Sequence, residues 1–141
     1  MPLPIAPGVE LPDRDLTLTF VRGSGPGGQN VNKLATAAQL RFDLAGSGAL
    51  DAQVKERLRA LSGQRLTGEG AILIIARRQR TQEGNRREAE ERLAELVRRA
   101  LVPPKPRKAT RPTRAARERR LQHKSRRRST KRLRARPGFE D

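Results

Sequence analysis

The chain runs Leu16-Thr17-Leu18-Thr19-Phe20-Val21 and then, without interruption, Arg22-Gly23-Ser24-Gly25-Pro26-Gly27-Gly28-Gln29, so an alternating pattern leads straight into a glycine-rich loop. Leucine and phenylalanine alternate with threonine before the loop, which predicts a strand with one buried face. After the loop, Leu40, Phe42 and Leu44 alternate with polar residues in the same way. We therefore expect two strands that pair antiparallel around the loop.

A short amphipathic helix is predicted next. Val54, Leu58 and Leu61 recur at helical spacing after Asp51, a residue type that caps helices, and Ser62-Gly63 ends the pattern. We expect this apolar stripe to cover the sheet.

The remaining head elements are a third strand and a longer helix. Ala71–Ala76 is an apolar run rich in β-branched residues and is predicted to be a central strand buried on both faces. An amphipathic helix is expected from Thr81 or Asn85 to Leu101, while Met1–Asp13 is expected to be extended without regular structure. The predicted fold class is α+β, with a small mixed sheet of about three strands and two helices in the order β-β-α-β-α.

The charge changes abruptly after this helix. Residues 1–102 contain 16 basic and 12 acidic side chains, whereas residues 103–141 contain 16 basic and 3 acidic ones. We expect a compact domain over residues 1–102, a proline-rich linker over 103–112 and a basic tail over 113–141. The tail has too few apolar groups to offset its ordering entropy, so it is predicted to be disordered when free and helical on a partner. The alternative is a solvated, RNA-binding tail without a defined site.

The overall composition limits the possible functions. A net charge of +17 favours a nucleic acid as partner, but with 2% aromatic residues the chain is expected to bind RNA through phosphates and shape. Cysteine is absent and His123 is the sole histidine, which argues against a thiolate nucleophile and a zinc site, so no metal and no cofactor are predicted. The longest apolar run is too short to span a bilayer, so a cytoplasmic protein without membrane contact is expected.

Three ordinary uses of the glycine-rich loop fit poorly. The segment from Gly23 to Gly28 matches the dinucleotide-binding pattern, but the stretch between Gln29 and Ala38 is shorter than the roughly dozen residues that a parallel crossover needs. A phosphate-binding P-loop would need Gly-Lys-Ser/Thr, which is missing here. A plain hairpin turn would need only two or three residues or so.

The fourth use is catalytic. The stretch from Arg22 to Lys33 resembles the Gly-Gly-Gln signature of class I peptide-chain release factors and their small relatives. Near the carboxyl end, Arg111-Pro112-Thr113-Arg114-Ala115 and Glu118-Arg119-Arg120-Leu121 resemble the codon-independent ribosome-rescue factors of bacteria. The resemblance is loose over residues 34–102 and close at both ends. Release factors that read stop codons carry additional domains, for which 141 residues leave no space.

The resemblance implies a ribosome-dependent peptidyl-tRNA hydrolase that rescues ribosomes stalled without a stop codon. Gly27, Gly28 and Gln29 would enter the peptidyl-transferase centre of the large subunit and promote attack of water on the ester between the nascent peptide and P-site tRNA. The neutral Gln29 amide cannot act as a general base near neutral pH, but it can orient a water molecule. The ribosome would therefore complete the chemistry.

The resemblance also implies that the tail occupies the empty mRNA entry channel of the small subunit. The expected partners are the ribosome, its rRNA and P-site peptidyl-tRNA, bound by a monomer. The tail residues that would contact the ribosome are Arg114, Arg117, Arg120, Leu121, Lys124, Lys131 and Arg134.

Two other functions stay open at this point. A non-enzymatic ribosomal protein or RNA chaperone would use the basic tail alone and would leave the Gly27-Gly28-Gln29 context unexplained. A hydrolase acting on free peptidyl-tRNA would need a base of its own.

Overall fold

The computed structural model describes residues 1–23 and 35–135. The chain divides into two compact units, Met1–Pro104, here called the head, and a second unit that begins at Lys105. The head contains β1 (Leu3–Ala6), β2 (Val9–Leu11), the 3-10 turn η1 (Asp13–Asp15), β3 (Leu16–Val21), β4 (Ala37–Phe42), α2 (Ala52–Ser62), the 3-10 turn η2 (Gly63–Arg65), β5 (Ile72–Ala76) and α3 (Gln82–Leu101), and the second unit contains α4 (Arg114–Arg134).

The main sheet of the head has the strand order β3-β4-β5. Leu18 lies opposite Leu40, and Leu40 lies opposite Ile74, so the same face of all three strands carries apolar side chains. This face is the one that the alternating pattern predicts. The expected antiparallel pairing of the two strands that flank the glycine-rich loop is confirmed.

The sheet is antiparallel throughout, so the predicted mixed sheet is wrong in this respect. The cause is a reversal just before β5. Thr67 and Gly70 form a turn in which the Gly70 N–H donates to the Thr67 carbonyl at 3.1 Å, and Leu66 forms an antiparallel bridge with Ile72. The chain therefore enters β5 against the direction of β4.

β5 lies at an edge of the sheet, whereas a central strand buried on both faces was predicted for this segment. Ile72 and Ile74 are buried on the inner face, but Ile75, on the outer face, is 46% exposed. A continuous apolar run is typical of a central strand and also of an edge strand whose outer face is uncovered. Only the pairing with neighbouring strands distinguishes these two positions in the sheet.

The first residues form a β-hairpin in place of the expected irregular segment. β1 and β2 pair antiparallel, with Leu3 opposite Leu11. Leu11 and Ile5 are buried in the core, and Arg98 Nε donates to the Ile5 carbonyl at 3.2 Å. These contacts join the two ends of the head, which a local sequence pattern does not reveal.

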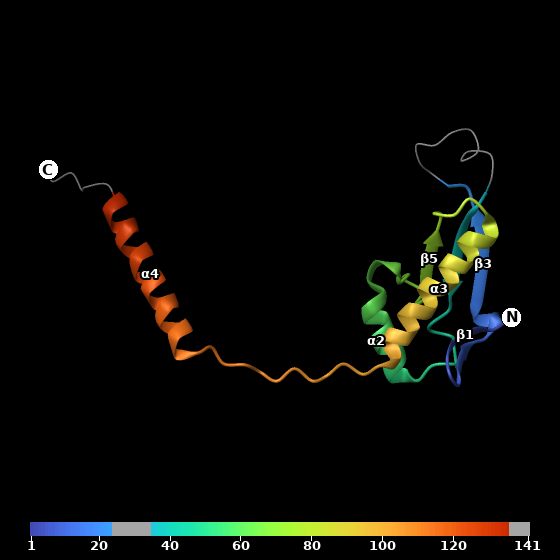
Figure 1. Cartoon of the computed structure of the whole chain (residues 1–141), viewed down its shortest axis with the longest axis horizontal. Helices are drawn as coiled ribbons and strands as arrows, with labels where there is room; N and C mark the ends of the chain where they lie inside the picture. Colours follow the sequence, from blue (N-terminus) through green and yellow to red (C-terminus); the bar gives the residue numbers. More distant parts are fainter. Residues whose placement is uncertain (24–34, 136–141) are drawn as a thin grey trace. The chain divides into compact units, whose positions relative to one another are not determined.

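The long helix α3 covers the inner face of the sheet and α2 packs mainly on α3 (Figure 1). Leu93 and Val97 on α3 are fully buried. Arg57 on α2 donates from Nε to the Ala100 carbonyl at 2.6 Å, which ties the two helices together. The apolar stripe of α2 thus meets α3, and not the sheet as predicted, while the predicted extents of both helices agree with the structure.

The predicted α+β class is therefore confirmed, with one antiparallel sheet, an additional hairpin and two helices in the described part of the head. Within residues 1–23 and 35–135, we find no helix of the length and apolarity needed to cross a membrane.

Candidate functional site

Three strand ends meet at one end of the sheet, here called the loop end. Val21, the last residue of β3, lies opposite Ala37, and Ala38 lies opposite Ala76, the last residue of β5. The two stems of the glycine-rich loop and the β5–α3 connector therefore emerge side by side. The predicted catalytic residues Gly27, Gly28 and Gln29 are on this loop and lie outside the described residues.

A buried asparagine ties the loop end together. Asn85, in the first turn of α3, is 0% exposed. Its Nδ2 donates to the Thr36 carbonyl at 2.7 Å and to the Gln79 carbonyl at 3.0 Å, and its Oδ1 accepts from the Gln79 N–H at 2.8 Å. One side chain thus holds the second stem of the loop and the middle of the β5–α3 connector.

The second stem has another attachment, at the surface. Gln82 Nε2 donates to the Ala35 carbonyl at 2.7 Å, and this bond is exposed to solvent. The amino-terminal turn of α3 therefore fixes the two backbone carbonyls of Ala35 and Thr36, which follow the glycine-rich loop.

Replacing Asn85 by alanine is expected to destabilise the protein by about 2–3 kcal/mol, because the Thr36 and Gln79 groups would lose a buried partner. Replacing the exposed Gln82 by alanine should cost less than about 1 kcal/mol, since water can satisfy Ala35. Urea unfolding of the full chain measures both values. Equal values for the two variants would contradict the role of Asn85.

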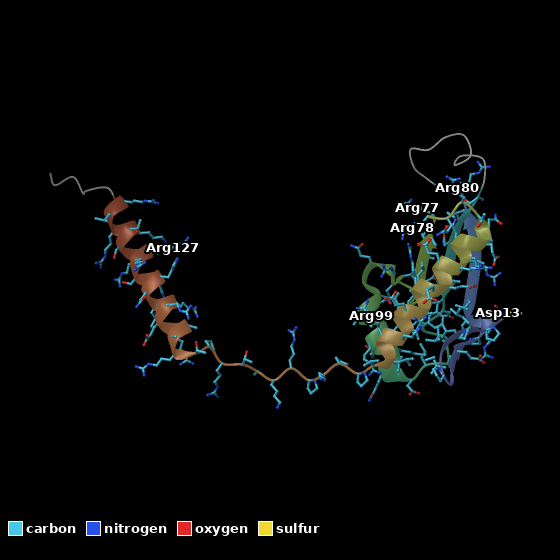
Figure 2. All side chains as sticks on the ribbon, in the orientation of Figure 1. Asp13, Arg77, Arg78, Arg80, Arg99 and Arg127 are labelled. Carbon is cyan, nitrogen blue, oxygen red and sulfur yellow. The ribbon has the colours of Figure 1, made fainter. Side chains whose placement is uncertain are left out.

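Asn85 and the connector were not among the residues that the sequence analysis selected. Asn85 lies one helical turn before Ala89 on the apolar face of α3, and a lone amide on such a face signals a buried polar contact. The connector contains Arg77, Arg78 and Arg80 directly after an apolar strand, and Figure 2 shows these side chains at the loop end.

A hydroxyl–carboxylate pair in the described part of the head lies away from the loop stems. A hydrogen bond of 2.6 Å joins Ser47 Oγ to Asp15 Oδ2, but Asp15 immediately precedes β3 and so lies at the opposite end of the sheet. Among the described residues there is no group of three or more histidine, cysteine, aspartate and glutamate side chains able to hold a metal ion. The sole histidine, His123, lies on α4.

The second unit carries the predicted tail residues on the helix α4. Thr113 caps the helix, with its Oγ1 accepting from the Ala116 N–H at 3.2 Å, as the sequence predicts for this residue. No residue of α4 is buried. The structure thus gives the helical form of the tail, and its disorder in the free protein stays a prediction.

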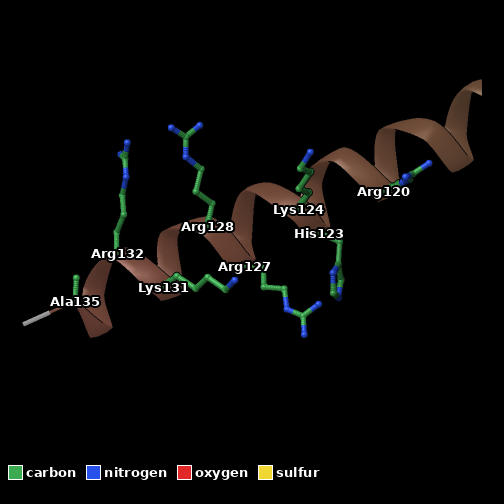
Figure 3. Close-up of a pocket in the computed structure, with 8 residues that line it drawn as sticks. All are labelled: Arg120, His123, Lys124, Arg127, Arg128, Lys131, Arg132 and Ala135. Atoms are coloured by element: carbon green, nitrogen blue, oxygen red, sulfur yellow. The ribbon is translucent and has the colours of Figure 1, made fainter.

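One side of α4 is strongly basic. The seven tail residues selected from the sequence recur mostly at intervals of three, four and seven, so they form one broad stripe on the helix. Ala115, Gln122 and Ser129, spaced seven apart, lie on the other side. By helical spacing Arg127 and Arg128 lie within this stripe, and Figure 3 shows their side chains extending away from the helix in different directions.

Comparison with known proteins identifies the family. A family model described as RF-1 domain matches residues 5–136 of the chain. The chain is also 45% identical over 137 residues to peptidyl-tRNA hydrolase ArfB of Pseudomonas putida, with 97% of this chain and 99% of the relative covered. It belongs to the RF-1 domain family, among the ArfB proteins. The family predicted from the sequence is thereby confirmed.

Two further relatives place this RF-1 domain in a wider group. The chain is 29% identical over 90 residues to large ribosomal subunit protein mL62 of Mus musculus, covering 64% of this chain and 44% of the relative. It is 32% identical over 78 residues to the chloroplastic peptide chain release factor PrfB1 of Arabidopsis thaliana, covering 55% of this chain and 17% of the relative. Parts of this chain are therefore similar to parts of a release factor and of a ribosomal protein.

Proposed function

We propose that this RF-1 domain protein is a ribosome-dependent peptidyl-tRNA hydrolase that frees stalled ribosomes without a stop codon. The observation that carries the proposal is the near full-length similarity to peptidyl-tRNA hydrolase ArfB, in a chain that retains Gly27-Gly28-Gln29. The protein acts in the cytoplasm, as a monomer, on the ribosome, its rRNA and P-site peptidyl-tRNA.

The proposed reaction breaks the ester bond between the nascent peptide and the P-site tRNA. Water attacks the ester carbonyl, and the Gln29 backbone N–H stabilises the developing negative charge on oxygen. The Gln29 side chain orders the water, while Gly27 and Gly28 give the backbone the freedom to approach the ester closely. Placement of the reacting groups supplies much of the rate.

The proposal assigns the proton transfers and the surrounding electrostatics to the ribosome. Support comes from the loop end, where the two side chains that bond the second stem, Asn85 and Gln82, are neutral amides that donate to backbone carbonyls. Such groups hold a loop in place but do not accept a proton near neutral pH. The proposed activity therefore requires the ribosome, whereas hydrolysis of free peptidyl-tRNA would require a base in the protein itself.

The proposal divides the chain into a catalytic domain over residues 1–102, a linker over 103–112 and a ribosome-binding tail over 113–141. The compact unit that ends at Pro104 and the separate helix α4 support this division. The basic side of α4 would bind rRNA phosphates in the mRNA entry channel when no message fills it. Its proposed contacts are Arg114, Arg117, Arg120, Leu121, Lys124, Lys131 and Arg134.

The length of mRNA beyond the P site provides the test of this function. Stalled ribosomal complexes that differ only in this length should release peptide fastest when the mRNA ends at the P site, because the tail and the message compete for one channel. Released peptide is measured over time, and purified peptidyl-tRNA without ribosomes is the control. Hydrolysis of that free substrate, or release with a full channel at an equal rate, would contradict the proposal.

A further inference from the structure

In the β5–α3 connector, both backbone polar groups of the central residue, Gln79, are hydrogen-bonded. An ordinary charged surface loop is not held in this way. The Gln79 N–H and carbonyl both bond to the buried Asn85 side chain, at 2.8 and 3.0 Å. The arginines on either side of Gln79 therefore start from a fixed backbone. The same asparagine donates to the Thr36 carbonyl, so the position of the connector is fixed relative to the second stem of the glycine-rich loop.

Gly84 provides a second restraint on the connector. A Cβ at this position would lie 2.8 Å from Gln79 Cβ and 3.0 Å from Thr81 Oγ1. The connector thus folds back tightly over the first turn of α3, where Thr81 Oγ1 also accepts from the Gly84 N–H at 3.1 Å. Two independent contacts give the connector a defined shape.

Two arginines of the connector, Arg78 and Arg80, are exposed at the surface. Arg78 reaches Glu88 only at 4.0 Å and its side chain is 79% exposed, so this ion pair contributes little. Glu88 is also engaged by Arg92 at 2.5 Å. Guanidinium groups held beside a loop that enters an RNA site are suited to RNA phosphates.

We infer that Arg78 and Arg80 form a second RNA-binding surface of the protein, which contacts backbone phosphates beside the catalytic loop and aligns that loop. The inference rests on the proposed function, since it places the loop end of the head against the RNA of the large subunit. It goes beyond the tail, because it assigns part of the ribosome affinity to the head.

The test compares two double variants of the full chain that lose the same charge. The first is Arg78→Gln with Arg80→Gln, and the control is Arg65→Gln with Arg99→Gln, two exposed arginines outside the connector, of which Arg99 lies near the other end of α3 (Figure 2). Binding to stalled ribosomes is measured by co-sedimentation over a range of salt concentrations. The connector variant should bind about tenfold more weakly near ~0.1 M salt, with a salt slope lower by about 1.4–1.8, while the control should change little.

The two sources of phosphate, rRNA and tRNA, are separated by repeating the measurement on ribosomes with an empty P site. Weaker binding of the connector variant on both kinds of ribosome assigns the contact to rRNA, and weaker binding only with P-site tRNA assigns it to tRNA. Either result supports the inference. Equal binding of the connector and control variants would overturn it. Peptide release by the wild-type chain from the same stalled ribosomes, measured separately, would show that the proposed function still holds.

Discussion

A chain with Gln29→Ala is expected to bind stalled ribosomes with unchanged affinity and to release peptide at least about 100-fold more slowly. The variant keeps the backbone N–H at position 29, but it loses the side-chain amide that orders the water. The neutral side chain is not expected to contribute to ribosome affinity, which the proposal assigns to the arginines and lysines. Single-turnover release from complexes without mRNA beyond the P site measures the rate, and co-sedimentation measures the affinity.

The matched control is Gln64→Ala, which removes an exposed glutamine of the η2 turn. This variant should release peptide at the wild-type rate. Undiminished release by Gln29→Ala would contradict the mechanism, whereas a loss of binding would show that the side chain serves attachment instead of chemistry.

Removing residues 113–141 is expected to abolish stable ribosome binding at about 0.15 M salt, because the tail contributes most of the net positive charge. For the full chain, affinity should fall by roughly 10³ between about 50 and 200 mM salt, as expected for a protein that contacts several phosphates. The truncated chain should show a much flatter dependence. Its thermal unfolding should match that of the full chain, since the buried apolar core lies between Ile5 and Ala100.

A charge-matched pair on α4 distinguishes a defined site from a merely basic tail. Lys124→Gln with Lys131→Gln changes the basic side of the helix, and Arg119→Gln with Arg126→Gln changes the opposite side. A defined channel contact predicts weaker binding and slower release only for the first pair. Equal losses for both pairs would favour non-specific attachment of the tail.

The sequence predicted the elements well where the pattern is local. Leu16–Val21 is a strand over its full predicted length, and α3 begins after Thr81, one of its two predicted starts. These features depend on side-chain alternation and on a capping hydroxyl, and both act over a few residues. The loop motif is likewise continuous in sequence, so its family could be inferred without the fold.

The errors concern contacts between distant segments. The run Ala71–Ala76 was expected at the sheet centre, yet β4 lies there because it pairs with both neighbours, and Ile75 is left half exposed. The N-terminal hairpin was missed because its short strands gain their stability from packing against α3. No local pattern distinguishes these arrangements from the predicted ones.

The sequence by itself determined the helix and strand segments, the Gly-Gly-Gln motif and the separation of a balanced domain from a basic tail, since each is encoded in neighbouring residues or in composition. Only the tertiary structure decided which strand is central and what supports the glycine-rich loop. Asn85 illustrates the difference, because it bonds Thr36 across 49 residues of chain and Gln79 across 6. Its buried amide acquires this role only when β4, the connector and α3 meet at the loop end of the sheet.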